Sequence, residues 1–93
     1  MDDSTAWVRL MQAVYGDEYL TVWHICLLVA ILYLWLNNDC KNPVPVTRRK
    51  LMKLSRIRSI ATYHKCIKDL VVLGYLRYQP SYHPKGSWMY LTR

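Results

Sequence analysis

The stretch that decides the fold begins T-R-R-K-L-M-K-L-S (47–55) and continues S-I-A-T-Y-H-K-C-I-K-D-L-V-V-L-G-Y (59–75). It ends L-R-Y-Q-P-S-Y-H-P-K-G-S-W-M-Y-L (76–91). The first two segments repeat apolar residues at helical spacing. The third alternates apolar and polar residues on both sides of a loop that contains prolines and a glycine. Two short helices joined by a tight turn, with a hairpin behind them, predict a mainly α fold: a winged helix-turn-helix with its helices over 47–74 and its wing over 75–92.

The first helix of this motif is expected over 48–54, with Thr47 as its N-cap. Leu51 and Leu54 share the side that faces the core. The turn that follows contains Ile57, an apolar plug that would fix the angle between the two helices. The other side of the helix is basic, with Arg48, Arg49, Lys50 and Lys53.

The second helix begins after Ser59, a second N-cap, and Gly74 suits the position just past its end. One side of this helix is apolar and is expected to be buried: Ile60, Tyr63, Cys66, Ile67 and Leu70. The opposite side starts with a small residue and continues with basic ones: Ala61, Lys65 and Lys68, with Thr62 and His64 on the flanks. The wing follows, and in its first strand Leu76 and Tyr78 alternate with polar residues, as in a half-buried strand.

Two further helices are predicted before this motif, over 4–16 and 21–36, so the chain is expected to form one domain over 1–93. The second of them is apolar on every side except at His24. Three interpretations compete: a membrane span, a central core helix, and a helix that also packs on a second copy. A membrane span needs about 20 residues, so no membrane association is expected. A domain this small cannot cover every side of the helix, which favours a core helix that also forms a homodimer.

Charge divides the chain unevenly. Residues 1–40 contain one basic and five acidic side chains, for a net −4, and residues 41–93 contain twelve basic and one acidic, for a net +11. Together they give the net charge of +7. A segment this basic attracts a polyanion, and nucleic acid is the commonest one. The alternative is a basic surface that is only solvated.

The outward side of the 59–74 helix suits the major groove of double-stranded DNA, because a small residue permits close approach and lysines reach bases or phosphates. Contacts to bases are predicted for Arg58, Ser59, Ala61, Thr62, His64 and Lys65. Contacts to phosphates are predicted for Arg48, Arg49, Lys53, Arg56 and Lys68. The wing contributes hydroxyl, imidazole and ammonium groups, which suit contacts to phosphates. These groups belong to Tyr82, His83, Lys85 and Ser87. Each prediction has an alternative. The lysines could be only solvated, His64 could be partly buried, and the wing loop could be an ordinary surface loop.

The chain shows no pattern of a catalytic or metal site. Its cysteines, Cys26, Cys40 and Cys66, are odd in number and follow no signal peptide, which predicts a reducing cytoplasm. No glycine loop for phosphates, nucleophile elbow or zinc-type ligand pair is present. We therefore expect a protein that is not an enzyme, uses no cofactor and is cytoplasmic and nucleoid-associated.

On these motifs the chain resembles the MarR-like winged helix-turn-helix proteins of bacteria, through L-M-K-L-S-R-I (51–57), S-I-A-T-Y-H-K-C-I-K-D-L (59–70) and L-G-Y-L-R-Y (73–78). It is also similar to small DNA-binding proteins of bacterial mobile elements. The resemblance covers roughly residues 20–92. It implies a regulator of transcription or excision that acts on the element's own DNA, with a third edge strand near 42–46. The long C-terminal dimerisation helices of larger relatives are missing, which leaves dimerisation to the N-terminal helices.

The sequence supports two functional hypotheses of different class. The first is sequence-specific binding of double-stranded DNA. The second is a winged-helix module that binds another protein, such as a phage or host factor, without specific DNA readout, since this fold serves both purposes. A preference for one duplex over random duplex distinguishes them.

Overall fold

The computed structural model describes residues 3–80 and 86–92, which form four helices and one small antiparallel sheet of three strands. The prediction of a mainly helical fold with a small hairpin is confirmed at this level. In chain order the elements are α1 (Asp3–Gly16), α2 (Val22–Asn37), β1 (Val44–Val46), α3 (Arg48–Ser55), α4 (Ile60–Val72), β2 (Leu76–Gln79) and β3 (Ser87–Leu91).

The sheet has the order β1–β3–β2. Strands β2 and β3 form the predicted hairpin, with Leu76 opposite Leu91. Strand β1 comes from the proline-containing connector before α3 and pairs antiparallel with β3, with Val44 opposite Met89. The third edge strand that the resemblance implied is therefore present. Its Pro45 has no N–H to donate, which an edge strand tolerates.

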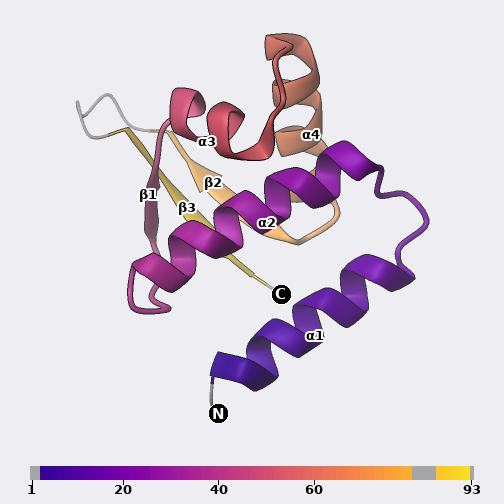
Figure 1. Cartoon of the computed structure of the whole chain (residues 1–93), viewed down its shortest axis with the longest axis vertical. Helices are drawn as coiled ribbons and strands as arrows, with labels where there is room; N and C mark the ends of the chain where they lie inside the picture. Colours follow the sequence, from indigo (N-terminus) through magenta and orange to yellow (C-terminus); the bar gives the residue numbers. More distant parts are fainter. Residues whose placement is uncertain (1–2, 81–85, 93) are drawn as a thin grey trace.

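Helix α2 lies across one face of the sheet, with α3 and α4 at one end of the molecule and α1 at the other (Figure 1). Its buried side packs against both α3 and α4. The interpretation of α2 as the central core helix is thus confirmed. The end of α1 is attached through Tyr75, whose hydroxyl donates to Asp17 Oδ2 at 2.8 Å and lies 3.3 Å from the carbonyl oxygen of Ala13.

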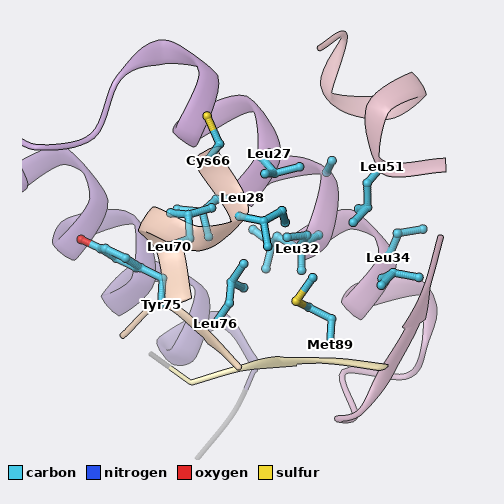
Figure 2. Packing of buried hydrophobic residues seen from close by; sticks show 14 of the residues in the cluster. Leu27, Leu28, Leu32, Leu34, Leu51, Cys66, Leu70, Tyr75, Leu76 and Met89 are labelled. Atoms are coloured by element: carbon cyan, nitrogen blue, oxygen red, sulfur yellow. The ribbon is translucent and has the colours of Figure 1, made fainter. Parts of the chain in front are cut away.

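The core forms where α2 meets the sheet and α4 (Figure 2). Leu27, Leu28 and Ile31 on α2 are fully buried, as is Met89 in the central strand. Burying one such side chain contributes about 1.5–3 kcal/mol relative to leaving it in water. This layer joins the sheet to α2 and α4.

The ends of α3 and α4 form as predicted. Thr47 Oγ1 accepts a hydrogen bond from the Lys50 N–H at 3.1 Å, and Ser59 Oγ accepts one from the Thr62 N–H at 3.2 Å. Gly74 has φ +85°, and the N–H of the next residue donates to a carbonyl in the last turn of α4. Left-handed backbone at this position is easiest for glycine. The predicted plug, Ile57, is buried in the turn.

Three residues predicted to face inward are exposed instead: Leu54, Ile60 and Tyr78. In the short helix α3 the second inward position is Ser55, one turn after Leu51, so Leu54 points aside. Ile60 is the first residue of α4, where the helix extends past the core. Tyr78 is in an edge strand near its outer end, where its hydroxyl donates to Ser87 Oγ at 3.0 Å.

The outer side of α2 is not covered by any of the residues that the structure describes. Val22, Val29, Tyr33 and Leu36 are exposed and Cys26 is half-buried. We call these five residues the α2 stripe. Successive members are four, three, four and three positions apart, which is the spacing of contact residues in a coiled coil. No helix in the described part of the chain is long and apolar enough to cross a membrane.

Candidate nucleic-acid interface

The outward side of α4 is open to solvent. Ala61, His64, Lys65 and Lys68 are all exposed, as predicted from the sequence. Figure 1 shows α4 at the end of the molecule away from α1, so no other helix covers this side. A cleft lies on each flank of α4, and basic residues line both.

The first cleft, which we call the Trp23 cleft, lies where α2 meets the turn before α4, with a volume of about 380 Å³. Trp23 of α2 is 45% exposed along it, and the buried Ile57 is also part of its wall. Arg56 adopts left-handed backbone with φ +66°, which reverses the chain between the two helices. The lining residues include two positive charges and no acid: Trp23, Arg56, Ile57, Arg58, Ser59 and Thr62.

The second cleft, which we call the tyrosine cleft, lies between the start of α3, the middle of α4 and β2, with a volume of about 360 Å³. Burial, with a smaller contribution from the nearby Tyr78 phenol, raises the pKa of Tyr63 to about 12, although Arg48 opposes the shift. The Tyr63 phenol therefore stays protonated at neutral pH. The lining residues are Arg48, Arg49, Tyr63, His64, Ile67 and Tyr78.

The two clefts lie on opposite sides of the outward face of α4. Successive residues of a helix are rotated by about 100°, so Thr62 in the Trp23 cleft and His64 in the tyrosine cleft fall on either side of Ala61 and Lys65. Each flank therefore presents two arginines beside the exposed helix. A ligand that met all three surfaces would need negative charge along two lines, with hydrogen-bond acceptors for Lys65 between them.

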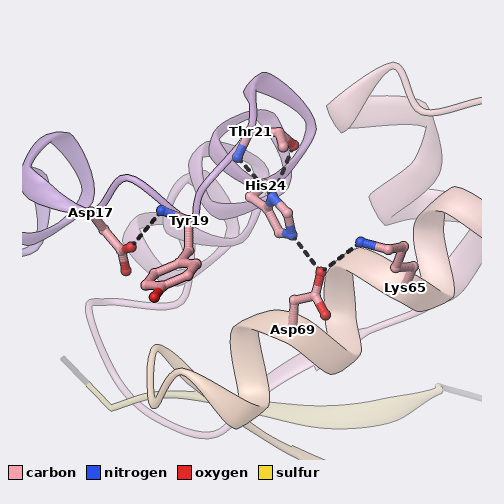
Figure 3. Close-up of polar contacts among 6 residues, drawn as sticks. All are labelled: Asp17, Tyr19, Thr21, His24, Lys65 and Asp69. Atoms are coloured by element: carbon pink, nitrogen blue, oxygen red, sulfur yellow. Dashed lines mark hydrogen bonds and ion pairs between the residues drawn. The ribbon is translucent and has the colours of Figure 1, made fainter.

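One hydrogen-bonded network ties α4 to the start of α2 (Figure 3). His24 is buried, and its Nδ1 accepts from the Thr21 N–H at 2.9 Å, as in a capping box. In the neutral ring the proton is therefore on Nε2, which donates to Asp69 Oδ2 at 2.9 Å. Lys65 Nζ lies 3.3 Å from the same oxygen.

The carboxyl group of Asp69 is stabilised in its charged form. The hydrogen bond from His24 is the main reason that the pKa of Asp69 is lowered from its ordinary value of 3.8. The Lys65 ammonium lowers it further, and partial burial opposes both. The Lys65 side chain is 75% exposed, so this ion pair adds little stability. Lys65 can exchange Asp69 for another anion at small cost.

This network predicts a pH dependence of stability. A carboxyl group whose pKa is lower in the folded chain stabilises the fold above its unfolded pKa, and that contribution is lost as the pH falls through the folded value. We expect Asp69→Asn, whose side-chain carbonyl still accepts from His24, to be less stable than the wild type at pH 7. The difference should shrink as the pH falls below about 4 and disappear once the carboxyl group of the folded chain is protonated. Urea titrations across this range measure it, and a difference that stays constant would contradict the assignment.

The residues predicted to contact DNA differ in where the structure places them. Arg48 and Arg49 line the tyrosine cleft, and Arg56 and Arg58 line the Trp23 cleft. The side chains of Lys53 and Lys68 are exposed without lining either cleft. Two predicted hydroxyl groups already make hydrogen bonds, those of Ser59 and Ser87. The predicted wing residues Tyr82, His83 and Lys85 lie outside the described residues.

The sequence did not point to Trp23 or Tyr78 as site residues. Trp23 is one of many apolar residues in α2, and only the packing of α2 against the helix-turn-helix brings it to the first cleft. The contact between His24 and Asp69 had a visible signal. His24 is the one polar residue between positions 22 and 36 of an otherwise apolar helix, and Asp69 is the single acid after residue 40.

In the described part of the chain, no group of three or more histidine, cysteine or acidic residues lies together as metal ligands would. Comparisons with protein-family models, curated proteins and solved structures found no match. The surface of α4 and its two flanking clefts are the features that bear on function.

Proposed function

We propose that the chain is a winged helix-turn-helix protein that binds specific sequences of double-stranded DNA with α4 in the major groove. In the cytoplasm it would regulate transcription or excision of a mobile element. The main support is the pair of basic clefts on either side of the exposed face of α4. A major groove has the same pattern: two phosphate backbones with base edges between them.

The roles of the residues follow from their positions on this surface. Ala61 and Lys65, in the middle of the exposed face, would approach base edges, with Thr62 and His64 beside them. Arg48 and Arg49 would bind the phosphates of one strand. Arg58, predicted from the sequence to contact bases, lines the Trp23 cleft with Arg56, so these two would bind the phosphates of the other strand. Lys53 and Lys68 add positive charge at longer range. A binding energy dominated by these charges falls as salt rises.

We also propose that two copies bind DNA together through the α2 stripe. An exposed helix face normally has polar side chains, but every residue of the stripe is apolar. A second copy presents the same uncharged stripe at the same spacing, so the two fit about a twofold axis. A twofold dimer would read a DNA site made of two related halves.

The role of the base-reading face is tested on a duplex enriched from a random library by the wild-type protein, with a scrambled duplex as reference. By fluorescence anisotropy, the enriched duplex should bind about a thousandfold more tightly. Lys65→Ala should reduce this preference. Arg48→Ala should weaken both duplexes alike and reduce the slope of log affinity against log salt by about 0.9.

Arg9→Ala is the matched control, because it removes one exposed positive charge from α1, far from the interface. It should change neither the preference nor the slope measurably. Failure to enrich any sequence, with weak binding that modest salt abolishes on every duplex, would refute specific DNA binding. The alternative, a protein-binding module, would then be preferred.

The dimer is tested by placing a charge in the stripe. Val29 is already 49% exposed, so Val29→Lys loses little packing within one chain but would put two like charges at the contact. Sedimentation analysis should show a dimer for the wild type and a monomer for the variant. Val72→Lys, at an exposed valine at the end of α4, should remain dimeric. A wild type that sediments as a monomer at every concentration would rule the dimer out.

A further inference from the structure

We propose that the Trp23 cleft holds one nucleotide of the DNA backbone, with its phosphate against Arg56 and Arg58 and its deoxyribose against the indole of Trp23. This inference rests on the proposed function and extends it. It assigns a DNA contact to α2, a helix that otherwise forms the core. It also names a residue whose contribution does not depend on charge.

Trp23 is 45% exposed, although Leu27, one turn further along α2, is fully buried. It is not one of the α2 stripe, and it lies next to the start of α4 instead. Large aromatic side chains that are left half-exposed beside a cleft are enriched at contacts with partners.

The Trp23 cleft combines positive charge with apolar surface. Arg56 and Arg58 are both exposed, and the residue between them, Ile57, is buried. The backbone thus places two guanidinium groups around an apolar wall formed by Ile57 and Trp23. A nucleotide has the same division, with an anionic phosphate joined to a sugar whose faces are apolar. A volume of about 380 Å³ lies in the range of sites for small ligands.

The Trp23 cleft lies beside the outward face of α4. Thr62 lines the cleft and is next to Ala61 on the outward face. A helix in the major groove has a sugar–phosphate strand on each side, so the cleft would meet the strand on the Thr62 side. This location favours the backbone of bound DNA over a free anion.

The test separates the apolar contact from the ionic one. On the enriched duplex, Trp23→Ala should lower affinity about fivefold or more at every salt concentration, because removing an anchoring aromatic commonly costs that much. The slope against salt should stay unchanged. Arg58→Ala, in the same cleft, should reduce the slope by about 0.9. Tyr19→Ala, at a more exposed aromatic outside the cleft, should have no effect.

A second measurement uses a conservative substitution that keeps an aromatic ring in the cleft. DNA should protect part of the wild-type tryptophan fluorescence from acrylamide, and Trp23→Phe should lose that protection while keeping most of the affinity. Equal protection in both proteins, or unchanged affinity of Trp23→Ala, would overturn the assignment and leave specific DNA binding intact. Protection by free deoxynucleotide that equals protection by duplex would overturn it in favour of a small-anion site. A wild type that binds no duplex specifically would end both proposals.

Discussion

Leu28→Ala is expected to lower the free energy of unfolding by about 3–5 kcal/mol. Leu28 lies in the middle of α2 and is fully buried against α4 and the sheet (Figure 2). Truncating it removes apolar contacts and leaves a cavity, because the sheet and two helices that surround the position cannot all move inward. A loss of this size is a large share of the total stability of a small domain. Urea unfolding followed by circular dichroism measures it.

Val72→Ala is the matched control for this substitution. Val72 is 76% exposed in the last turn of α4, so the same kind of truncation there removes little buried surface. Alanine also has the better helix propensity. The change should therefore stay within about 0.5 kcal/mol in either direction. If the two variants lost similar stability, α2 could not be the central helix of the core.

Gly86→Ala is expected to cost about 2–4 kcal/mol and to weaken the pairing of β1 with β3. Gly86 has φ +101°, a region that costs other residues about 1–3 kcal/mol. A Cβ at this position would also collide with the carbonyl oxygen of Val46 and lie 2.8 Å from Thr47 Cγ2. Both neighbours belong to the junction of β1 and α3. The substitution therefore strains the hairpin and the start of the helix-turn-helix together.

Gly16→Ala provides the comparison for Gly86→Ala. An added Cβ at Gly16 meets no atom within 4 Å, and the residue ends α1. We expect it to be neutral or stabilising by up to about 1 kcal/mol, since alanine loses less backbone entropy on folding. Equal losses at both glycines in urea titrations would show that the close approach at Gly86 does not determine its cost.

The sequence predicted every helix, both hairpin strands and the two N-caps, because each depends on local chemistry. Thr47 and Ser59 stand just before apolar residues at helical spacing, and each caps the helix that follows. Gly74 ends α4 for a similar reason. The errors occurred where a residue's environment depends on distant elements. Ile60 continues the apolar side of α4 in the sequence, but no other element reaches far enough to cover it.

The candidate site was predicted only in part. The basic residues of α3 and α4 could be identified because they are close in the sequence and lie opposite the apolar side. Trp23 could not, because 33 positions separate it from Arg56, and only the packing of α2 joins them. The link from His24 to Asp69 spans a similar distance. A single polar residue in an apolar helix and a single acid in a basic segment can therefore indicate two residues that meet in the fold.

The order of the strands has a consequence for how the chain folds as it is synthesised. Strand β3 is the last element in chain order, yet it lies between β1 and β2. On the ribosome, β1 has no partner until Ser87–Leu91 emerges, and the apolar side of α2 lacks Met89 beneath it until the same moment. A nascent chain therefore exposes core surface until β3 has emerged, and the core can close only after that step.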